Sequence, residues 1–204
     1  MKNREKAIVF CYDENQIITL DEKDGKISEL LRGEICKHHR VVLDKEIRQK
    51  EDIYAFCEKV ASGKTIDICK YKNVKIIITN NPQEEEEAIK KYTGRGYAYI
   101  CYPSFMRAAA GERDQYSFRW EDKSGYAMNI SRTNQITTEE ALGNDYDKVL
   151  LDADWILSNR EDSSLDKRGC LYINMTRAKL SLCLLTSNVK QLNKTLQLFP
   201  PVEE

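Results

Sequence analysis

Two arginines stand where a charged side chain could act on a polyphosphate. Arg177 lies at the end of a predicted helix that leads directly into the apolar run 180–185, so its side chain is placed to reach across a cleft between domains. Arg48 follows a predicted strand. A guanidinium group is always protonated, and its forked donors match phosphate oxygens. Both arginines therefore have donors that suit a phosphate chain, although Arg48 taken alone is better explained as a residue of a surface ion pair.

The loop that would hold such a phosphate chain has no counterpart in the sequence. The pattern G-x-x-x-x-G-K-[ST], whose backbone N–H groups and lysine bind the β- and γ-phosphates, does not occur. The motif at residues 94–96, Gly-Arg-Gly, predicts a turn rather than a dinucleotide site, because a strand follows it. We therefore expect ATP and Mg²⁺ to bind only where a separate domain completes the site, and we expect no ATP hydrolysis by the chain alone.

Predicted strands alternate with predicted helices along the chain, which is typical of a three-layer α/β domain with a mainly parallel sheet. Apolar runs rich in β-branched residues predict strands, and apolar residues at helical spacing predict helices. The strands are expected at residues 7–12, 41–47, 74–79, 97–102, 126–130, 147–152 and 180–186, and the helices at 27–34, 50–61, 83–92, 137–142, 167–179 and 189–198.

Composition excludes several classes of protein. A hydrophobic content of 41% with 32% charged residues indicates a soluble globular chain rather than a disordered one. A net charge of −1 argues against a protein that coats nucleic acid. The apolar runs are too short to span a membrane, and the charged N-terminal residues are not followed by an apolar region of the signal-peptide type. The seven cysteines include no C-x-x-C, which indicates reduced thiols in the cytoplasm and no metal site.

Four segments resemble, in order, the later motifs of superfamily 1 helicases of the UvrD/Rep-like type. Residues 8–16 resemble motif III, residues 43–49 motif IV, residues 137–147 motif V, and residues 171–179 the final motif, Y-V-x-x-T-R-A. The resemblance implies a RecA-like (P-loop NTPase-type) fold. Residues 25–204 would be the second RecA-like domain, and residues 1–24 a remnant of the first domain with a linker.

The resemblance also implies roles for individual residues. Gln16 would sense the γ-phosphate, and Arg48 and Arg177 would contact the phosphates as catalytic groups. Gly143, Asp145 and Thr176 would line the nucleotide site, and Thr137 would contact nucleic acid. Two departures from motif V are expected to weaken binding: Asp145 is shorter than the usual Glu, and Glu139 replaces a His.

Three hypotheses about function follow. In the first, the chain supplies arginine fingers to ATP held by a separate or missing phosphate-loop domain. In the second, it is a degenerate stand-alone domain that acts as a protein-interaction or regulatory module. In the third, residues 104–120, including Arg119 and Trp120, bind single-stranded nucleic acid by stacking and phosphate contacts.

Overall fold

The protein is built around one parallel sheet. The computed structural model describes residues 48–101, 135–154 and 167–202, together with Glu29 and Gly33. Five parallel strands form the sheet in the order β2-β6-β5-β3-β4. They are β2 (Val74–Ile78), β3 (Ala98–Ile100), β4 (Gln135–Ile136), β5 (Tyr146–Asp152) and β6 (Ala178–Thr186).

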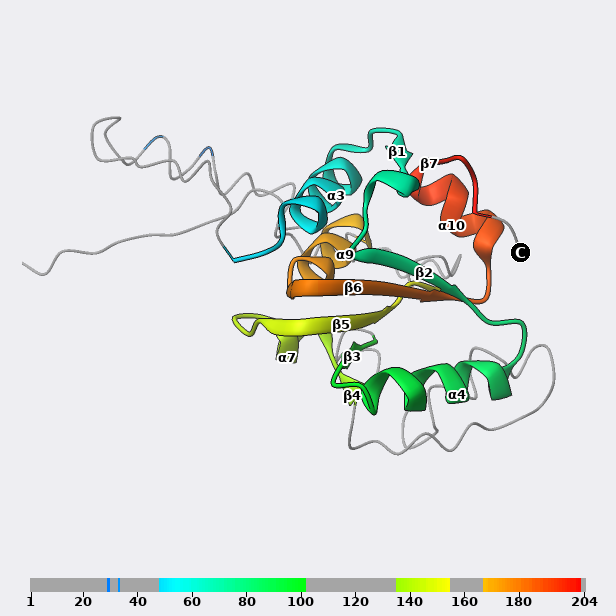
Figure 1. Ribbon diagram of the computed structural model, residues 1–204. Helices are drawn as coiled ribbons and strands as arrows, with labels where there is room; N and C mark the ends of the chain where they lie inside the picture. The colour runs from blue at the N-terminus through cyan, green and yellow to red at the C-terminus, as the bar shows by residue number, and fades with distance from the viewer. Residues whose placement is uncertain (1–28, 30–32, 34–47, 102–134, 155–166, 203–204) are drawn as a thin grey trace, which may run out of the picture.

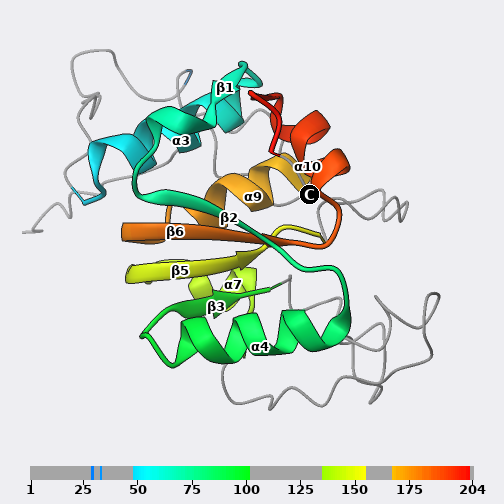
Figure 2. The same ribbon diagram turned by 45° about the vertical axis from the view of Figure 1, so that its right-hand side comes forward.

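Helices cover both faces of this sheet (Figures 1 and 2). On one face lie α3 (Glu51–Ser62), α9 (Lys167–Met175) and α10 (Val189–Leu196), and on the other lies α4 (Pro82–Thr93). The short helix α7 (Thr138–Ala141) precedes β5, and a 3₁₀ turn, η2 (Ile68–Lys70), precedes β2. Two further strands, β1 (Ile66–Asp67) and β7 (Leu198–Phe199), form a separate parallel pair. The predicted three-layer α/β class with a parallel sheet is confirmed.

The central strands are buried on both faces, as parallel strands require. Successive side chains of a strand point to opposite faces, so Leu182 and Leu184 of β6 pack with α3, α9 and α10. The intervening Cys183 and Leu185 pack with Ile89 of α4 on the other face. All four residues of this stretch are fully buried, so the apolar run contributes side chains to a hydrophobic core on each face of the sheet.

Local capping signals set the ends of several helices. The Asn81 side chain accepts a hydrogen bond from the backbone N–H of Glu84 at 2.9 Å, and Pro82 follows Asn81 as the first residue of α4. Helix α3 ends at Gly63, whose positive φ of 62° suits the left-handed position after a helix. These helices match the expected ranges 50–61 and 83–92 within one or two residues.

Other boundaries differ from expectation. Helix α9 ends at Met175, four residues before the expected end, and β6 begins at Ala178 rather than at residue 180. Met, Arg, Ala and Lys favour helix, but pairing of Ala178 with Tyr146 draws this segment into the sheet. Helix α10 ends in a left-handed Gln197 and not at the prolines. The strands β1, β4 and β7 were not expected, because two residues are too short to show an alternating pattern.

Several expectations fall on residues outside the described ranges. They are the strands at 7–12, 41–47 and 126–130, the boundary between residues 24 and 25, and the side chains of Gln16, Arg119 and Trp120. Of the expected helix 27–34, Glu29 and Gly33 are described, and both are helical. None of the described cysteines is in a disulfide bond. Among the described residues, no helix has the length and apolar composition needed to span a bilayer.

Candidate functional site

The pairing of β5 with β6 places Asp145 beside Arg177. Tyr146 pairs with Ala178, and each charged residue immediately precedes one member of this pair. The backbone N–H of Tyr146 donates to the carbonyl of Arg177 at 2.9 Å, so the two segments are joined where the charged side chains leave the backbone. Arg177 Nη1 lies 4.0 Å from Asp145 Oδ1. Both residues therefore lie at the amino edge of the sheet, and not at the carboxyl edge where α/β domains usually bind ligands.

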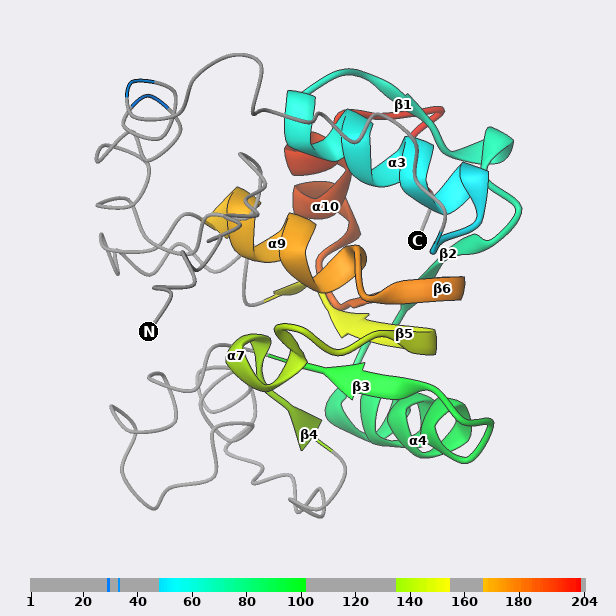
Figure 3. The ribbon, with the colours of Figure 1, turned by 90° about the vertical axis from the view of Figure 1, so that its left-hand side faces the viewer.

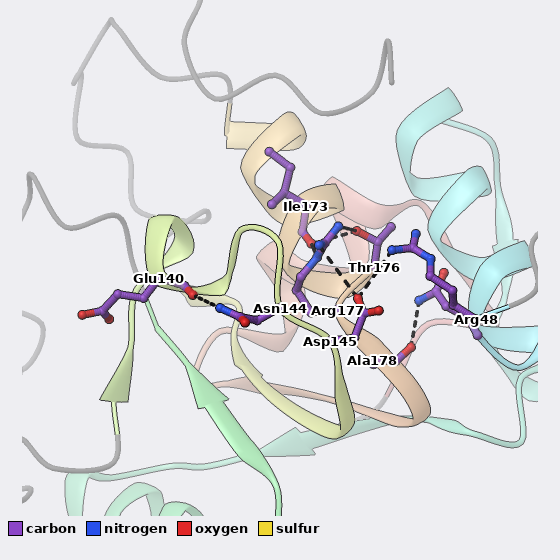
Figure 4. A network of polar contacts seen from close by, with 9 residues as sticks. Arg48, Glu140, Asn144, Asp145, Ile173, Thr176, Arg177 and Ala178 are labelled. Atoms are coloured by element: carbon purple, nitrogen blue, oxygen red, sulfur yellow. Dashed lines mark hydrogen bonds and ion pairs between the residues drawn. The ribbon is translucent and has the colours of Figure 1, made fainter. Parts of the chain in front are cut away.

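Arg48 reaches the same carboxylate from another part of the chain. The Gln49 side chain donates to the carbonyl of Ala178 at 2.8 Å, and the backbone N–H of Lys50 donates to the carbonyl of Lys179 at 2.9 Å. These bonds fix the start of α3 against the first residues of β6. Arg48 Nη1 then lies 3.5 Å from Asp145 Oδ1, so two arginines share one carboxylate oxygen (Figure 4).

An aspartate and an asparagine hold α3 in this position. Asp52, in the first turn of α3, accepts from the backbone N–H of Asn73 at 2.8 Å and from its side-chain amide at 2.9 Å. Lys50 Nζ donates to Asn73 Oδ1 at 3.0 Å. Burial raises the pKa of the Asp52 carboxyl, but the hydrogen bonds from Asn73 and Ile53 outweigh it and place the pKa below its ordinary value. The ionised form of Asp52 is thus the one that binds α3 to the residue before β2.

The Arg177 side chain folds back on its own helix. Its Nε donates to the carbonyl of Ile173 at 3.0 Å, and its Nη2 donates to Thr176 Oγ1 at 3.1 Å. The Thr176 hydroxyl in turn donates to the same Ile173 carbonyl at 2.8 Å. The side chain is 4% exposed, against 45% for Arg48. Two edges of the guanidinium group therefore satisfy carbonyl and hydroxyl groups in the last turn of α9, and Nη1 is the nitrogen that lies towards Asp145.

A tight turn connects α7 to Asp145. Thr137 precedes α7 and forms a reciprocal cap: its N–H donates to Glu140 Oε2 at 2.7 Å, and its Oγ1 accepts from the N–H of Glu140 at 3.2 Å. After α7 the backbone turns at Gly143, whose φ is +77°. The Asn144 side chain then donates to the carbonyl of Glu140 at 2.9 Å, which closes the turn (Figure 4). Thr137 is fully buried, and its hydroxyl is used in this cap.

Gly143→Ala tests how far this turn positions Asp145. No atom lies within 4 Å of a Cβ built on Gly143, so the substitution meets no clash and its cost comes from the positive φ alone. We expect a loss of about 1–2 kcal/mol of unfolding free energy, measured by urea denaturation. Gly143→Asn is the matched control, because asparagine adopts left-handed conformations more readily and should lose clearly less. Equal losses in the two variants would contradict the backbone explanation.

Helix α9 is tied to α7 by a buried polar contact. The Asn174 side chain donates to Thr138 Oγ1 at 3.0 Å, and both residues are fully buried. Within the described part of the chain, the buried acceptors Asn174 Oδ1 and Gln49 Oε1 receive no hydrogen bond. Asn174 and Gln49 were missed by the sequence reasoning, as were Asp52 and Asn73. No local signal could have found them, because their partners lie in other elements of the fold.

A second polar group closes the opposite, carboxyl edge of the sheet. Asp154 accepts from the Thr186 hydroxyl and from the backbone N–H and hydroxyl of Ser187, the latter two at 2.8 and 2.5 Å. Its own N–H donates to Asp152 Oδ1 at 3.0 Å. These bonds link the ends of β5 and β6. Among the described residues there is no group of three or more histidine, cysteine or acidic side chains that could hold a metal ion.

The structure brings some, but not all, of the predicted site residues together. Arg48, Arg177 and Asp145 meet at the amino edge, with Thr176 and the Gly143 turn beside them (Figure 4). Figure 3 shows β5 and β6, the two strands that follow Asp145 and Arg177, side by side in the sheet. The guanidinium groups of Arg48 and Arg177 offer hydrogen-bond donors to an anion, and the site presents no pair of a nucleophile with a base among the described residues. Three further candidates lie outside the described residues: Gln16, Arg119 and Trp120.

Fold and site define an α/β domain with a fully parallel main sheet and a pair of arginines at its amino edge. No protein-family model matches the chain, and no curated protein matches it either. Among solved structures, the C-terminal domain of a possible DNA helicase from Lactobacillus plantarum WCFS1 is similar to this chain, with a TM-score of 0.42 and 16% sequence identity. The similarity covers 70% of this chain and 88% of the other.

Proposed function

We propose that this protein is the arginine-donating, C-terminal half of a superfamily 1 helicase-like ATPase that works in the cytoplasm. Arg48 and Arg177 contact the phosphates of ATP held by a separate phosphate-loop domain. The observation that carries the proposal is the convergence of these two arginines, from distant segments, on one carboxylate at one edge of the sheet. This arrangement supports anion binding, because two guanidinium groups direct donors toward one acceptor oxygen.

The chemical role follows from the charge that phosphoryl transfer concentrates on the transferred group. A fixed guanidinium near that group stabilises its oxygens in the transition state more than in the ground state. Arg177 suits this role, because its hydrogen bonds to Ile173 and Thr176 hold it in place before any ligand arrives. Arg48 is the more exposed of the two and suits a contact that forms as the two domains close.

The remaining candidates extend the same proposal. The turn at Gly143 and the neighbouring Thr176 would line the nucleotide site, and Gln16 would report on the γ-phosphate. Thr137 would contact nucleic acid only after the cap of α7 opens, because its N–H and its hydroxyl both bond to Glu140 and the residue is fully buried. Single-stranded nucleic acid would also contact the segment that contains Arg119 and Trp120. Mg²⁺ would be held with the ATP by the partner domain.

ATP turnover by the purified chain tests this function. We expect no turnover above background, with or without single-stranded nucleic acid. We expect turnover to appear when a phosphate-loop ATPase that the chain captures from native lysate is added back. Turnover by the chain alone that disappears in Arg177→Ala would contradict the proposal, because it would place a complete phosphate site within this chain.

A protein-interaction module is the second candidate, and the burial of Arg177 favours it. An arginine that is 4% exposed and bonded to its own helix also fits a purely structural role. Two leucines, Leu142 and Leu180, are exposed in the segments next to Gly143 and Lys179 and could contact a partner. On this reading the captured protein binds equally well to wild type and to Arg177→Ala, and its ATP turnover is the same with either.

A further inference from the structure

We propose that Asp145 is an internal competitor for the phosphate site. Its carboxylate occupies the place between Arg48 and Arg177 that a phosphate oxygen takes, and it thereby sets how tightly the arginine pair binds a polyphosphate. This inference rests on the proposed function. It changes the role of Asp145 from a nucleotide contact to a positioning residue that acts through the two arginines.

The distances support a carboxylate that is shared rather than tightly bound. Asp145 Oδ1 lies 3.5 Å from Arg48 Nη1 and 4.0 Å from Arg177 Nη1. Charge-assisted hydrogen bonds of this kind are normally about 2.7–2.9 Å long. One oxygen that contacts two cations at long range forms weak contacts with each. A phosphate group has more oxygens and more charge, so it can contact both arginines at shorter range.

Exposure shows which side chains can yield to a ligand. The side chains of Arg48 and Asp145 are 45% and 23% exposed, whereas that of Arg177 is 4% exposed. The guanidinium group of Arg177 is also held through Nε and Nη2 by its own helix. Entry of an anion therefore requires rotation of the Asp145 side chain and a small shift of Arg48, while Arg177 stays in place.

The backbone makes Asp145 a fixed part of the site even though its side chain can rotate. It lies between the Gly143–Asn144 turn, closed by the Asn144 side chain, and the first residue of β5, which is bonded to Arg177. No shift of the sheet is needed to move the carboxylate. Asp145 can thus leave the arginine pair when a phosphate enters and return when it departs.

Titration of the full chain with inorganic tripolyphosphate tests the inference. Binding is measured by calorimetry and by the NMR signals of the arginine Nε–H groups, for wild type, Asp145→Asn and Asp147→Asn. Asp147 is exposed and lies two residues after Asp145, in β5, so its variant removes the same charge nearby. We expect Asp145→Asn to bind on the order of tenfold more tightly than wild type, because it removes a like charge from the contact position. Asp147→Asn should change affinity by less than about twofold, since exposed charges are screened.

The outcomes separate this inference from the proposed function. If wild type binds tripolyphosphate through Arg48 and Arg177 but Asp145→Asn binds no more tightly, the inference is wrong and the proposed function stands. An equal gain in Asp147→Asn overturns it as well, because the effect would be general charge. If neither wild type nor Asp145→Asn binds, both the inference and the phosphate contact are wrong. If Arg48→Ala, added to Asp145→Asn, abolishes the tighter binding of tripolyphosphate, the inference is supported. Urea midpoints check that each variant is folded.

Discussion

Arg177→Ala is expected to lower the ATP turnover of the proposed complex with a phosphate-loop ATPase by roughly three to five orders of magnitude. The reason is that the transferred phosphoryl group loses the fixed positive charge that offsets its own charge in the transition state. Binding of the partner should persist, because Arg177 is buried and contributes little exposed surface to an interface. Steady-state turnover and partner affinity, measured on the same preparations, check the two parts of this result.

Two control variants sharpen this test. Arg177→Lys keeps the charge but cannot reproduce both bonds, to Ile173 and to Thr176, so it should recover only part of the turnover. Arg95→Ala removes an exposed arginine from the turn between α4 and β3 and should leave turnover unchanged. Urea denaturation should show a loss of about 1–2 kcal/mol for Arg177→Ala from its hydrogen bonds. Unchanged turnover in Arg177→Ala would favour the interaction module instead.

Leu184→Ala is expected to destabilise the domain by about 2–5 kcal/mol. Leu184 is fully buried in β6, the strand between β2 and β5, and packs with Phe56 and Met175 in the same core cluster. Its truncation removes buried methyl groups and leaves a cavity that neighbouring strands cannot close without breaking the sheet. The shift of the urea midpoint, with an unchanged slope, measures the loss.

Leu180→Ala is the matched control, because Leu180 lies in the same strand but is 45% exposed. Its loss should stay below about 1 kcal/mol. The contrast between the two variants tests whether the loss of unfolding free energy depends on the burial of the leucine in β6. Similar losses in the two variants would contradict the position of Leu184 in the core.

Elements with strong local signals were predictable from the sequence. Helix α4 carries its own start signal in Asn81 and Pro82, and an asparagine cap acts within one turn whatever surrounds it. Strand β2 is a run of β-branched residues, which favour extended backbone. The left-handed turn at Gly143 follows from the missing side chain of glycine. Such signals depend on neighbours within a few residues, so they can be recognised in the sequence without knowledge of the tertiary structure.

The end of α9 shows where local reasoning fails. Residues 177–179 (Arg, Ala and Lys) have good helix propensity, and the sequence predicts a helix through Lys179. The structure places Ala178 opposite Tyr146 in the sheet instead. Hydrogen bonds to a neighbouring strand outweigh a propensity difference of a few tenths of a kcal/mol per residue. The sequence of this segment does not show which strand it will pair with.

The candidate site divides in the same way. The sequence by itself identified Arg177 from its place between a predicted helix and a predicted strand, and it identified Arg48 and Asp145 through the resemblance to helicase motifs. Only the tertiary structure brought them together, through the register of β5 and β6 and the bonds from Gln49 and Lys50 to β6. The same contacts buried Arg177 and placed Asp145 between two cations. Register and burial depend on contacts between distant segments, and such contacts form only when the whole sheet assembles.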